Sequence, residues 1–143
     1  MKAFSSIVSI LVADDDDDDR MLIKKAFDEI GFTGNLYFTT NGEETLNFLR
    51  RQAAAKAAKS LLPDMLLLDL NMPKKNGFEV MREIKEDPKL AAIPIVILST
   101  TQTQADADRS YQAGAVGFLT KPSYFTDLVE ALRLLAQFAW ASI

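Results

Sequence analysis

The sequence contains neither cysteine nor histidine, and these two absences narrow the chemistry that the chain can perform. Without cysteine, the chain has no disulfides, no thiolate zinc sites and no cysteine nucleophiles. Without histidine, it has no imidazole base, no histidine metal ligand and no serine–histidine triad. Any reaction must therefore use carboxylates, hydroxyls, lysines and backbone groups.

Basic charge is also scarce, because 16 lysines and arginines face 20 aspartates and glutamates, for a net charge of −4. This balance argues against nucleic-acid binding, which needs a basic patch. The first six residues carry one lysine, and the short apolar run after them is too short to span a membrane and unlike a signal peptide. We therefore expect a cytoplasmic protein that binds neither nucleic acid nor membrane.

Two kinds of segment alternate along the 143 residues, a length that suits one domain. Short apolar runs typical of buried strands occupy 7–13, 35–38, 65–68, 94–98 and 117–119. Apolar residues at helical spacing occupy 18–30, 77–86, 104–113 and 124 to about 141, and a further helix begins near Asn41. We expect the helix that begins near Asn41 to continue through the alanine-rich residues 53–59 and to stop before Pro63.

This strict alternation of five strands and five helices predicts an α/β fold. Parallel pairing with right-handed crossovers would give a doubly wound sandwich with helices on both faces. We expect the common flavodoxin-like strand order 2-1-3-4-5, in which the first and third strands are neighbours. The expected organisation is a single domain over residues 1–143, with a core at 7–122 and a C-terminal helix at about 124–141.

Polar residues follow the predicted strands, at the edge where an open parallel sheet binds its ligands. They are Asp14 and Asp15, Asp69, Ser99 and Thr100, and Thr120 and Lys121. Two carboxylates about 4 Å apart repel by about 4 kcal/mol at an effective dielectric constant near 20. A divalent cation such as Mg²⁺ or Mn²⁺ removes this penalty. With a lysine and a hydroxyl beside it, such a site can hold a phosphoryl group, and one carboxylate can act as the nucleophile.

The motifs at these positions resemble those of the response-regulator receiver domain. The matching strings are residues 10–15, residues 67–73, Gly77, Gly114-Ala115 and Lys121-Pro122, which occur in that order. The resemblance covers residues 7–122 and is carried by five separate motifs. It implies a stand-alone receiver of a two-component phosphorelay, with the flavodoxin-like fold.

Carried over residue by residue, the resemblance implies that Asp69 is the phosphoacceptor. Asp14 and Asp15 resemble the acidic pair that binds Mg²⁺, with Asp15 the more direct ligand. Asn71 would offer its backbone carbonyl to the metal, and Lys121 would pair with the phosphoryl oxygens. The Lys121–Pro122 peptide bond resembles one that is usually cis in this family.

Two further positions resemble the switch residues of the family. Ser99 corresponds to the switch hydroxyl, and Phe118 lies at the aromatic switch position, where tyrosine is frequent. Phenylalanine cannot make the hydrogen bond of a tyrosine hydroxyl, so any output through Phe118 must rest on ring packing. A plain core role for Phe118 is the alternative.

The acidic segment departs from the family, because residues 14–19 are six consecutive aspartates. Arg20, which lies five residues after Asp15, supports Asp14 and Asp15 as the metal-binding pair. Asp15 and Asp16 are the other choice. The remaining aspartates would lie at the start of the first helix, where the helix dipole favours negative charge.

The resemblance implies a signalling switch rather than an enzyme, apart from self-catalysed phosphoryl transfer and autodephosphorylation. Because the chain has no histidine, a histidine kinase or histidine phosphotransfer protein would supply the phosphoryl group. Phosphorylation would then alter the surface formed by the fourth helix, fifth strand and fifth helix. We expect the output to be a contact with a downstream protein.

A phosphatase of the haloacid-dehalogenase type is the alternative from another class. Asp14 and Asp16 have the spacing of its nucleophile and general acid. That class also needs a late acidic pair, for which only Asp127 and Glu130 are available, and usually a cap domain. A flavodoxin is less well supported, because no phosphate-binding loop rich in Ser, Thr and Gly follows the first strand.

The last helix has a narrow polar stripe formed by Glu130, Arg133 and Gln137. The rest of its circumference is apolar, which is more than a surface helix needs to cover a core. This surplus, with Phe138, Trp140 and Ile143, predicts either a homodimer face or a tail folded back on its own domain.

Overall fold

The computed structural model describes residues 9–55, 62–100 and 103–141, with side chains up to Gln137. Within these residues, five parallel strands form one sheet in the order β2-β1-β3-β4-β5. The strands are β1 (Ser9–Ala13), β2 (Asn35–Thr39), β3 (Met65–Leu68), β4 (Ile95–Ser99) and β5 (Gly117–Thr120). The predicted fold class and strand order are therefore confirmed. Residues 7 and 8 of the predicted first strand lie outside the described residues.

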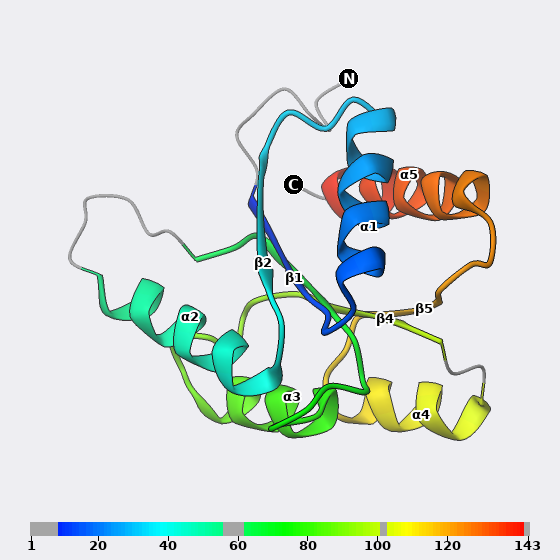
Figure 1. The fold of residues 1–143 in the computed structure, drawn as a ribbon. Helices are drawn as coiled ribbons and strands as arrows, with labels where there is room; N and C mark the ends of the chain where they lie inside the picture. Colours follow the sequence, from blue (N-terminus) through cyan, green and yellow to red (C-terminus); the bar gives the residue numbers. More distant parts are fainter. Residues whose placement is uncertain (1–8, 56–61, 101–102, 142–143) are drawn as a thin grey trace.

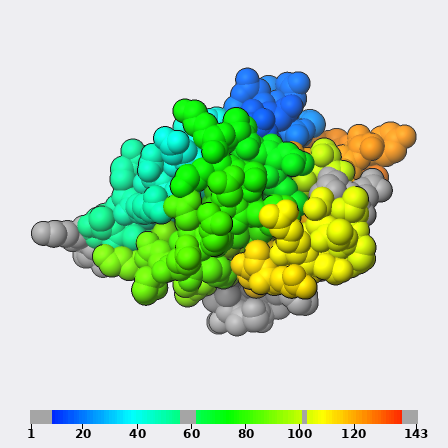
Figure 2. All heavy atoms as spheres, turned by 90° about the horizontal axis from the view of Figure 1, so that it is seen from below, coloured from blue at the N-terminus to red at the C-terminus, as the bar shows by residue number. Residues whose placement is uncertain are grey.

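Helices cover both faces of the sheet (Figure 1). They are α1 (Asp17–Glu29), α2 (Gly42–Ala54), α3 (Gly77–Glu86), α4 (Gln104–Gln112) and α5 (Phe125–Ala141). Helices α1 and α5 pack on one face, and α2, α3 and α4 lie on the other. Figure 2 looks at the second face and shows α2, α3 and α4 beside one another. None of the helices among the described residues is long and apolar enough to cross a membrane.

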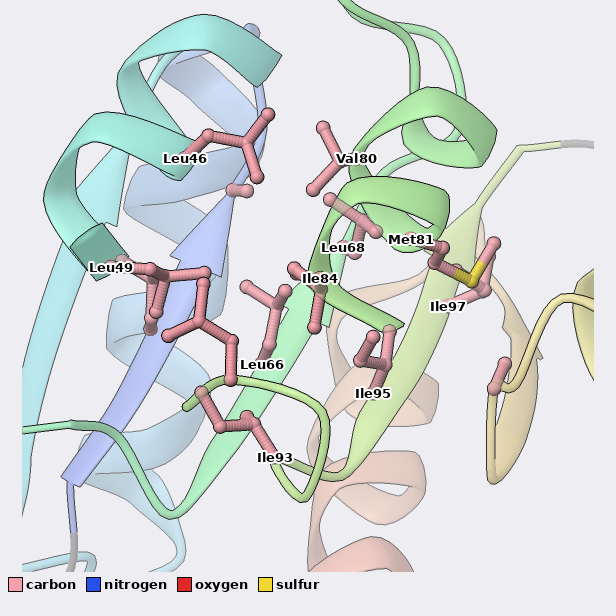
Figure 3. Close-up of a cluster of buried hydrophobic side chains, with 14 of the residues drawn as sticks. Leu46, Leu49, Leu66, Leu68, Val80, Met81, Ile84, Ile93, Ile95 and Ile97 are labelled. Carbon is pink, nitrogen blue, oxygen red and sulfur yellow. The ribbon is translucent and has the colours of Figure 1, made fainter. Parts of the chain in front are cut away.

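The three central strands are buried on both sides, which explains their continuous apolar sequences. Because successive side chains point to opposite faces, Ile10 and Val12 contribute to the core under α1 and α5, whereas Leu11 and Ala13 contribute to the other core. Figure 3 shows this second core between the sheet and helices α2 and α3. The apolar residues of both cores end where the strands end. The polar residues that follow the strands therefore lie together at one edge of the sheet.

Helices α1 to α4 each begin at a polar residue whose side chain caps the first turn. Asp16, Asn41, Asn76 and Thr103 each accept a hydrogen bond from the backbone N–H three residues later. Asn76 and Glu79 cap each other reciprocally and form a capping box at the start of α3. These caps fix where the helices begin relative to the strand ends.

The prediction that the second helix continues through residues 53–59 is wrong. Helix α2 ends at Ala54, and Ala55 has extended backbone angles of φ −65° and ψ 134°. Residues 56–61 lie outside the described residues. Helix propensity contributes only tenths of a kcal/mol per residue, and most helical stability in proteins comes from burying one face. The last residues of α2 to be buried are Leu46 and Leu49, so burial no longer supports the helix beyond its exposed end at Ala54.

Helix α5 buries Leu128, Val129, Leu132 and Ala136 against the sheet and α1. Leu134 on the same helix remains 62% exposed, and Tyr124 just before it is 72% exposed. The side chains of Phe138, Trp140 and Ile143 lie outside those described. The choice between a dimer face and a folded-back tail therefore stays open for these residues.

Candidate functional site

Two buried carboxylates lie side by side where β1 and β3 end. The register pairs Ala13 with Leu68, so the next residue of each strand is an aspartate, Asp14 or Asp69. The backbone N–H of Asp69 donates to the carbonyl of Ala13 at 3.0 Å, which joins the two strands one step further. One carboxylate oxygen from each of Asp14, Asp15 and Asp69 lies within 4.8 Å of the others. The predicted convergence of these three side chains is confirmed.

Lys121 brings a positive charge from β5 into this cluster. Its Nζ lies 2.6 Å from Asp14 Oδ2 and 3.4 Å from Asp69 Oδ2, and its side chain is only 12% exposed. The Lys121 N–H donates to the Ser99 carbonyl at 2.7 Å, which holds the end of β5 beside the end of β4. The Lys121–Pro122 peptide bond is trans, so the expectation of a cis bond is wrong for this structure.

Asp19 is a further partner of Lys121, outside the cluster of Asp14, Asp15 and Asp69, and the sequence reasoning missed it. Its Oδ2 lies 2.8 Å from Lys121 Nζ, closer than Asp69 does. Helical periodicity carries the signal that would have found it, because Asp19 precedes the buried residues Ile23 and Ala26 by four and seven positions. These spacings place Asp19 on the face of α1 that is turned toward the sheet.

Burial and charge act in opposite directions on these groups. Burial raises the pKa of Asp14 and of Asp69 above the usual value of 3.8, although Lys121 lowers both. Burial would lower the pKa of Lys121, but its hydrogen bonds to Asp14 and Asp19 outweigh this effect and raise its pKa. Burial thus makes the charged forms of Asp14 and Asp69 costly in free energy. A divalent cation coordinated by oxygen ligands would relieve that cost, and the donor set Asp14, Asp15 and Asp69 suits Mg²⁺ or Mn²⁺.

The remaining aspartates of the acidic run have other contacts. The Asp16 side chain caps α1 by accepting from the N–H of Asp19 at 2.9 Å, and its own N–H donates to Asp14 Oδ1 at 3.0 Å. Arg20 donates to the Asp14 carbonyl at 2.6 Å and pairs with Asp17. With Asp16 engaged as a cap, the geometry favours Asp14 and Asp15 over Asp15 and Asp16 as the metal-binding pair.

Ser99 is fully buried at the end of β4, and its Oγ has no hydrogen-bond partner within the part of the chain that the structure describes. A buried hydroxyl without a partner costs free energy, so such a group points to a missing ligand. The position of Ser99 next to Thr120 and Lys121 suits an acceptor bound at the same edge of the sheet.

The structure shows where Asn71 and Phe118 lie, but their positions do not test the roles predicted for them. Asn71 is exposed, and its N–H donates to Asp69 Oδ1 at 3.2 Å. Phe118 in β5 is half-buried and packs against the core under α2, α3 and α4. Metal binding by the Asn71 carbonyl and a switch role for Phe118 stay predictions.

The loop after Asp69 turns tightly because Gly77 fits against it. The Gly77 N–H donates to the Leu70 carbonyl at 2.8 Å. A Cβ at this position would lie 2.7 Å from the Asp69 carbonyl oxygen and 2.8 Å from Leu70 Cα, which is too close for any other residue without a backbone shift. Gly77 therefore helps to hold the end of β3 and the start of α3 together.

A doubly wound sheet with carboxylates, a buried hydroxyl and a lysine at its carboxyl edge defines a domain suited to binding a phosphoryl group. Residues 10–133 match the response regulator receiver domain family, and the chain belongs to this family. It is thus a phosphoacceptor domain of two-component signalling.

Relatives and solved structures agree with this assignment. The chain is 36% identical over 129 residues to the probable methanogenesis regulatory protein FilR2 of Methanothrix harundinacea, covering 90% of this chain and 81% of FilR2. It is 33% identical over 131 residues to the response regulator Rcp1 of Synechocystis sp., covering 92% of this chain and 87% of Rcp1.

Two crystal structures show the same fold at similar identity. The phosphorylated cyanobacterial phytochrome response regulator RcpA matches with a TM-score of 0.84 and 31% identity, covering 96% of this chain and 97% of RcpA. The Mn²⁺-bound form of Rcp1 matches with a TM-score of 0.81 and 31% identity, covering 95% and 96%.

Proposed function

We propose that this chain is a single receiver domain that accepts a phosphoryl group on Asp69 from a phosphohistidine of a histidine kinase or phosphotransfer protein. The observation that carries the proposal is the buried Asp69 carboxylate, which lies beside Asp14, Asp15 and Lys121 at one edge of the sheet. Such an exchange with a kinase would take place in the cytoplasm. The Mn²⁺-bound and phosphorylated relatives hold the same two kinds of group that this site suits.

The transfer uses groups that are already in place. A carboxylate oxygen of Asp69 attacks phosphorus, a P–O bond forms, and the P–N bond to the partner's imidazole breaks. The imidazole nitrogen leaves with the bonding electrons and takes a proton from solvent. Lys121 would pair with the phosphoryl oxygens, and the unpartnered Ser99 hydroxyl would donate a hydrogen bond to one of them.

Asp14, Asp15 and Asp69, with the backbone carbonyl of Asn71, would hold Mg²⁺ or Mn²⁺. When bound, the cation compensates the negative charge that gathers as a phosphoryl group approaches three carboxylates. Two observations support this fit. All the donor atoms are oxygens, and the buried carboxylates repel one another. Among the described residues, Lys121 alone forms ion pairs with these carboxylates, so much of the repulsion is left for a cation to relieve.

The added group carries about −1.5 to −2 charges and three acceptor oxygens, which would draw Ser99 and Phe118 toward new positions. Ser99 lies on β4 and Phe118 lies on β5, so their movement would change the surface formed by α4, β5 and α5. We infer that this surface binds a downstream protein, and that two copies of the chain can also pair through it. The exposed Leu134 and Tyr124 support an interface here. Sedimentation velocity of the unphosphorylated and the phosphorylated protein tests this pairing. A chain that stays monomeric in both states would contradict the proposed dimer.

The phosphatase alternative has less support. Asp127 and Glu130, the acidic pair it would need, are exposed on α5, and Glu130 pairs with Arg133. Asp16, its general acid, caps α1 instead. The acidic cluster that forms among the described residues is Asp14, Asp15 and Asp69.

A phosphorylation-site map tests the proposed function. The protein is incubated with acetyl phosphate and Mg²⁺, its intact mass is measured, and the modified peptide is identified after borohydride trapping. We expect one phosphoryl group on Asp69 that is absent without Mg²⁺ and absent in Asp69→Asn, while Asp127→Asn behaves like the parent. A label on Asp14 with steady hydrolysis of phosphate esters would favour the phosphatase. No label at all would contradict the proposed function.

A further inference from the structure

Lys121 has an anionic partner that does not belong to the strand ends. Asp19 comes from α1, 102 positions earlier in the chain, and its Oδ2 accepts a hydrogen bond from Lys121 Nζ at 2.8 Å. The distance from the same Nζ to Asp69 Oδ2 is 3.4 Å. The ammonium group is therefore held closer to Asp19 than to the phosphoacceptor.

The position of Asp19 is built into the first turn of α1. Its backbone N–H is anchored on the Asp16 side chain at 2.9 Å, and residues four and seven positions later, Ile23 and Ala26, are buried against the sheet. The Asp19 side chain is 34% exposed, whereas the Asp17 side chain is 89% exposed. Of the two, only Asp19 is turned into the site.

The contact between Asp19 and Lys121 matters because one ammonium group cannot pair equally closely with every anion around it. In the proposed function, Lys121 pairs with the oxygens of a phosphoryl group on Asp69. A phosphoryl oxygen must then attract Lys121 away from Asp19 or share it. Any free energy that the Lys121–Asp19 pair contributes before phosphorylation is subtracted from the stability of the phosphorylated state.

We propose that Asp19 is a positioning residue that competes with the phosphoryl group for Lys121, and so sets how readily the site accepts and holds that group. This inference rests on the proposed function. Asp19 is separate from the acidic cluster of Asp14, Asp15 and Asp69, so it acts through Lys121 rather than as part of that cluster. Asp14, whose Oδ2 lies 2.6 Å from Lys121 Nζ, stays a partner of Lys121 when the Asp19 charge is removed, but the phosphoryl oxygens then have one competitor fewer.

The test compares Asp19→Asn with Asp18→Asn at saturating Mg²⁺. Both variants remove one charge from neighbouring positions in the first turn of α1, but the described ion pairs of Lys121 include Asp19 and not Asp18. The probe is beryllofluoride, a tetrahedral phosphoryl mimic that binds a carboxylate, and its affinity is measured by calorimetry. A partly exposed ion pair contributes little, so we expect Asp19→Asn to bind about two- to fivefold more tightly than the parent.

Asp18→Asn should bind beryllofluoride like the parent, and thermal unfolding should show that both variants are folded. A second readout is the ¹⁵N signal of the Lys121 ammonium group, which should shift on beryllofluoride binding in the parent by more than in Asp19→Asn. Equal affinities for the two variants, or weaker binding by Asp19→Asn, would overturn the inference and leave the proposed function intact. Failure of the parent to bind beryllofluoride would instead overturn the proposed function and the inference with it.

Discussion

Leu68 and Asp69 are neighbours in the chain and almost equally buried, yet their surroundings differ completely. Leu68 is 0% exposed and packs in the apolar core under α2 and α3, where Figure 3 labels it. Asp69 is 6% exposed and lies among carboxylates and one lysine. Burial of the leucine stabilises the fold, whereas burial of the carboxylate costs free energy. The degree of burial alone therefore does not tell which residues stabilise this protein. The strand interior stabilises the fold, whereas the strand end carries the functional groups at a cost in stability.

The largest expected effect is on the strand interior. Leu68→Ala removes buried carbon atoms and leaves a cavity, so the free energy of unfolding should fall by about 2–5 kcal/mol. Urea denaturation followed by circular dichroism measures the change. Asp69→Asn is the matched variant one residue away, and it should keep the parent's stability or exceed it. If Asp69→Asn destabilises the protein as much as Leu68→Ala does, the contrast between strand interior and strand end is wrong.

The next effect concerns Lys121, which is the shared cation of the strand ends among the described residues. Lys121→Met leaves Asp14, Asp19 and Asp69 without their shared partner, and we expect a loss of about 2–3 kcal/mol in the absence of divalent cations. Millimolar Mg²⁺ should restore part of this stability, because it supplies the missing positive charge. Thermal unfolding with and without Mg²⁺ measures both effects.

Lys24→Met is the control for Lys121→Met, since Lys24 is exposed on α1. It should change stability by less than about 0.5 kcal/mol and show no extra response to Mg²⁺. Equal responses of the two lysine variants would mean that the site charges do not interact as the distances indicate.

The smallest effect is a pH dependence at the strand end. The folded protein holds the pKa of Asp69 above the usual 3.8, so stability from this group is lost as pH rises from 3.8 through the folded value. At pH 7 without divalent cations, Asp69→Asn should be more stable than the parent, and the difference should shrink as pH falls toward 4. Urea unfolding at both pH values measures it. A difference that grows toward low pH would show that the sign is reversed.

Much of this arrangement could be predicted because it follows from the ends of parallel strands. Asp14, Asp69, Ser99 and Lys121 each follow an apolar run, and a parallel sheet brings such positions to one edge. The end of α2 was predicted wrongly, because propensity suggested a longer helix than burial supports. The contact of Asp19 with Lys121 was missed, because it joins α1 to β5 across 102 positions.

The amino-acid sequence by itself determined the alternation of strands and helices and the polar residues at the strand ends, because these depend on periodicity and local signals. The strand order 2-1-3-4-5 followed from the order common to such sheets and from the resemblance to the receiver family, and not from these signals. Only the tertiary structure decided which of the six aspartates share Lys121, which one caps α1, and that the Ser99 hydroxyl is buried without a partner among the described residues. Adjacent residues of identical type have the same local signals. The packing of α1 against the sheet is what turns one aspartate inward and leaves its neighbours in solvent.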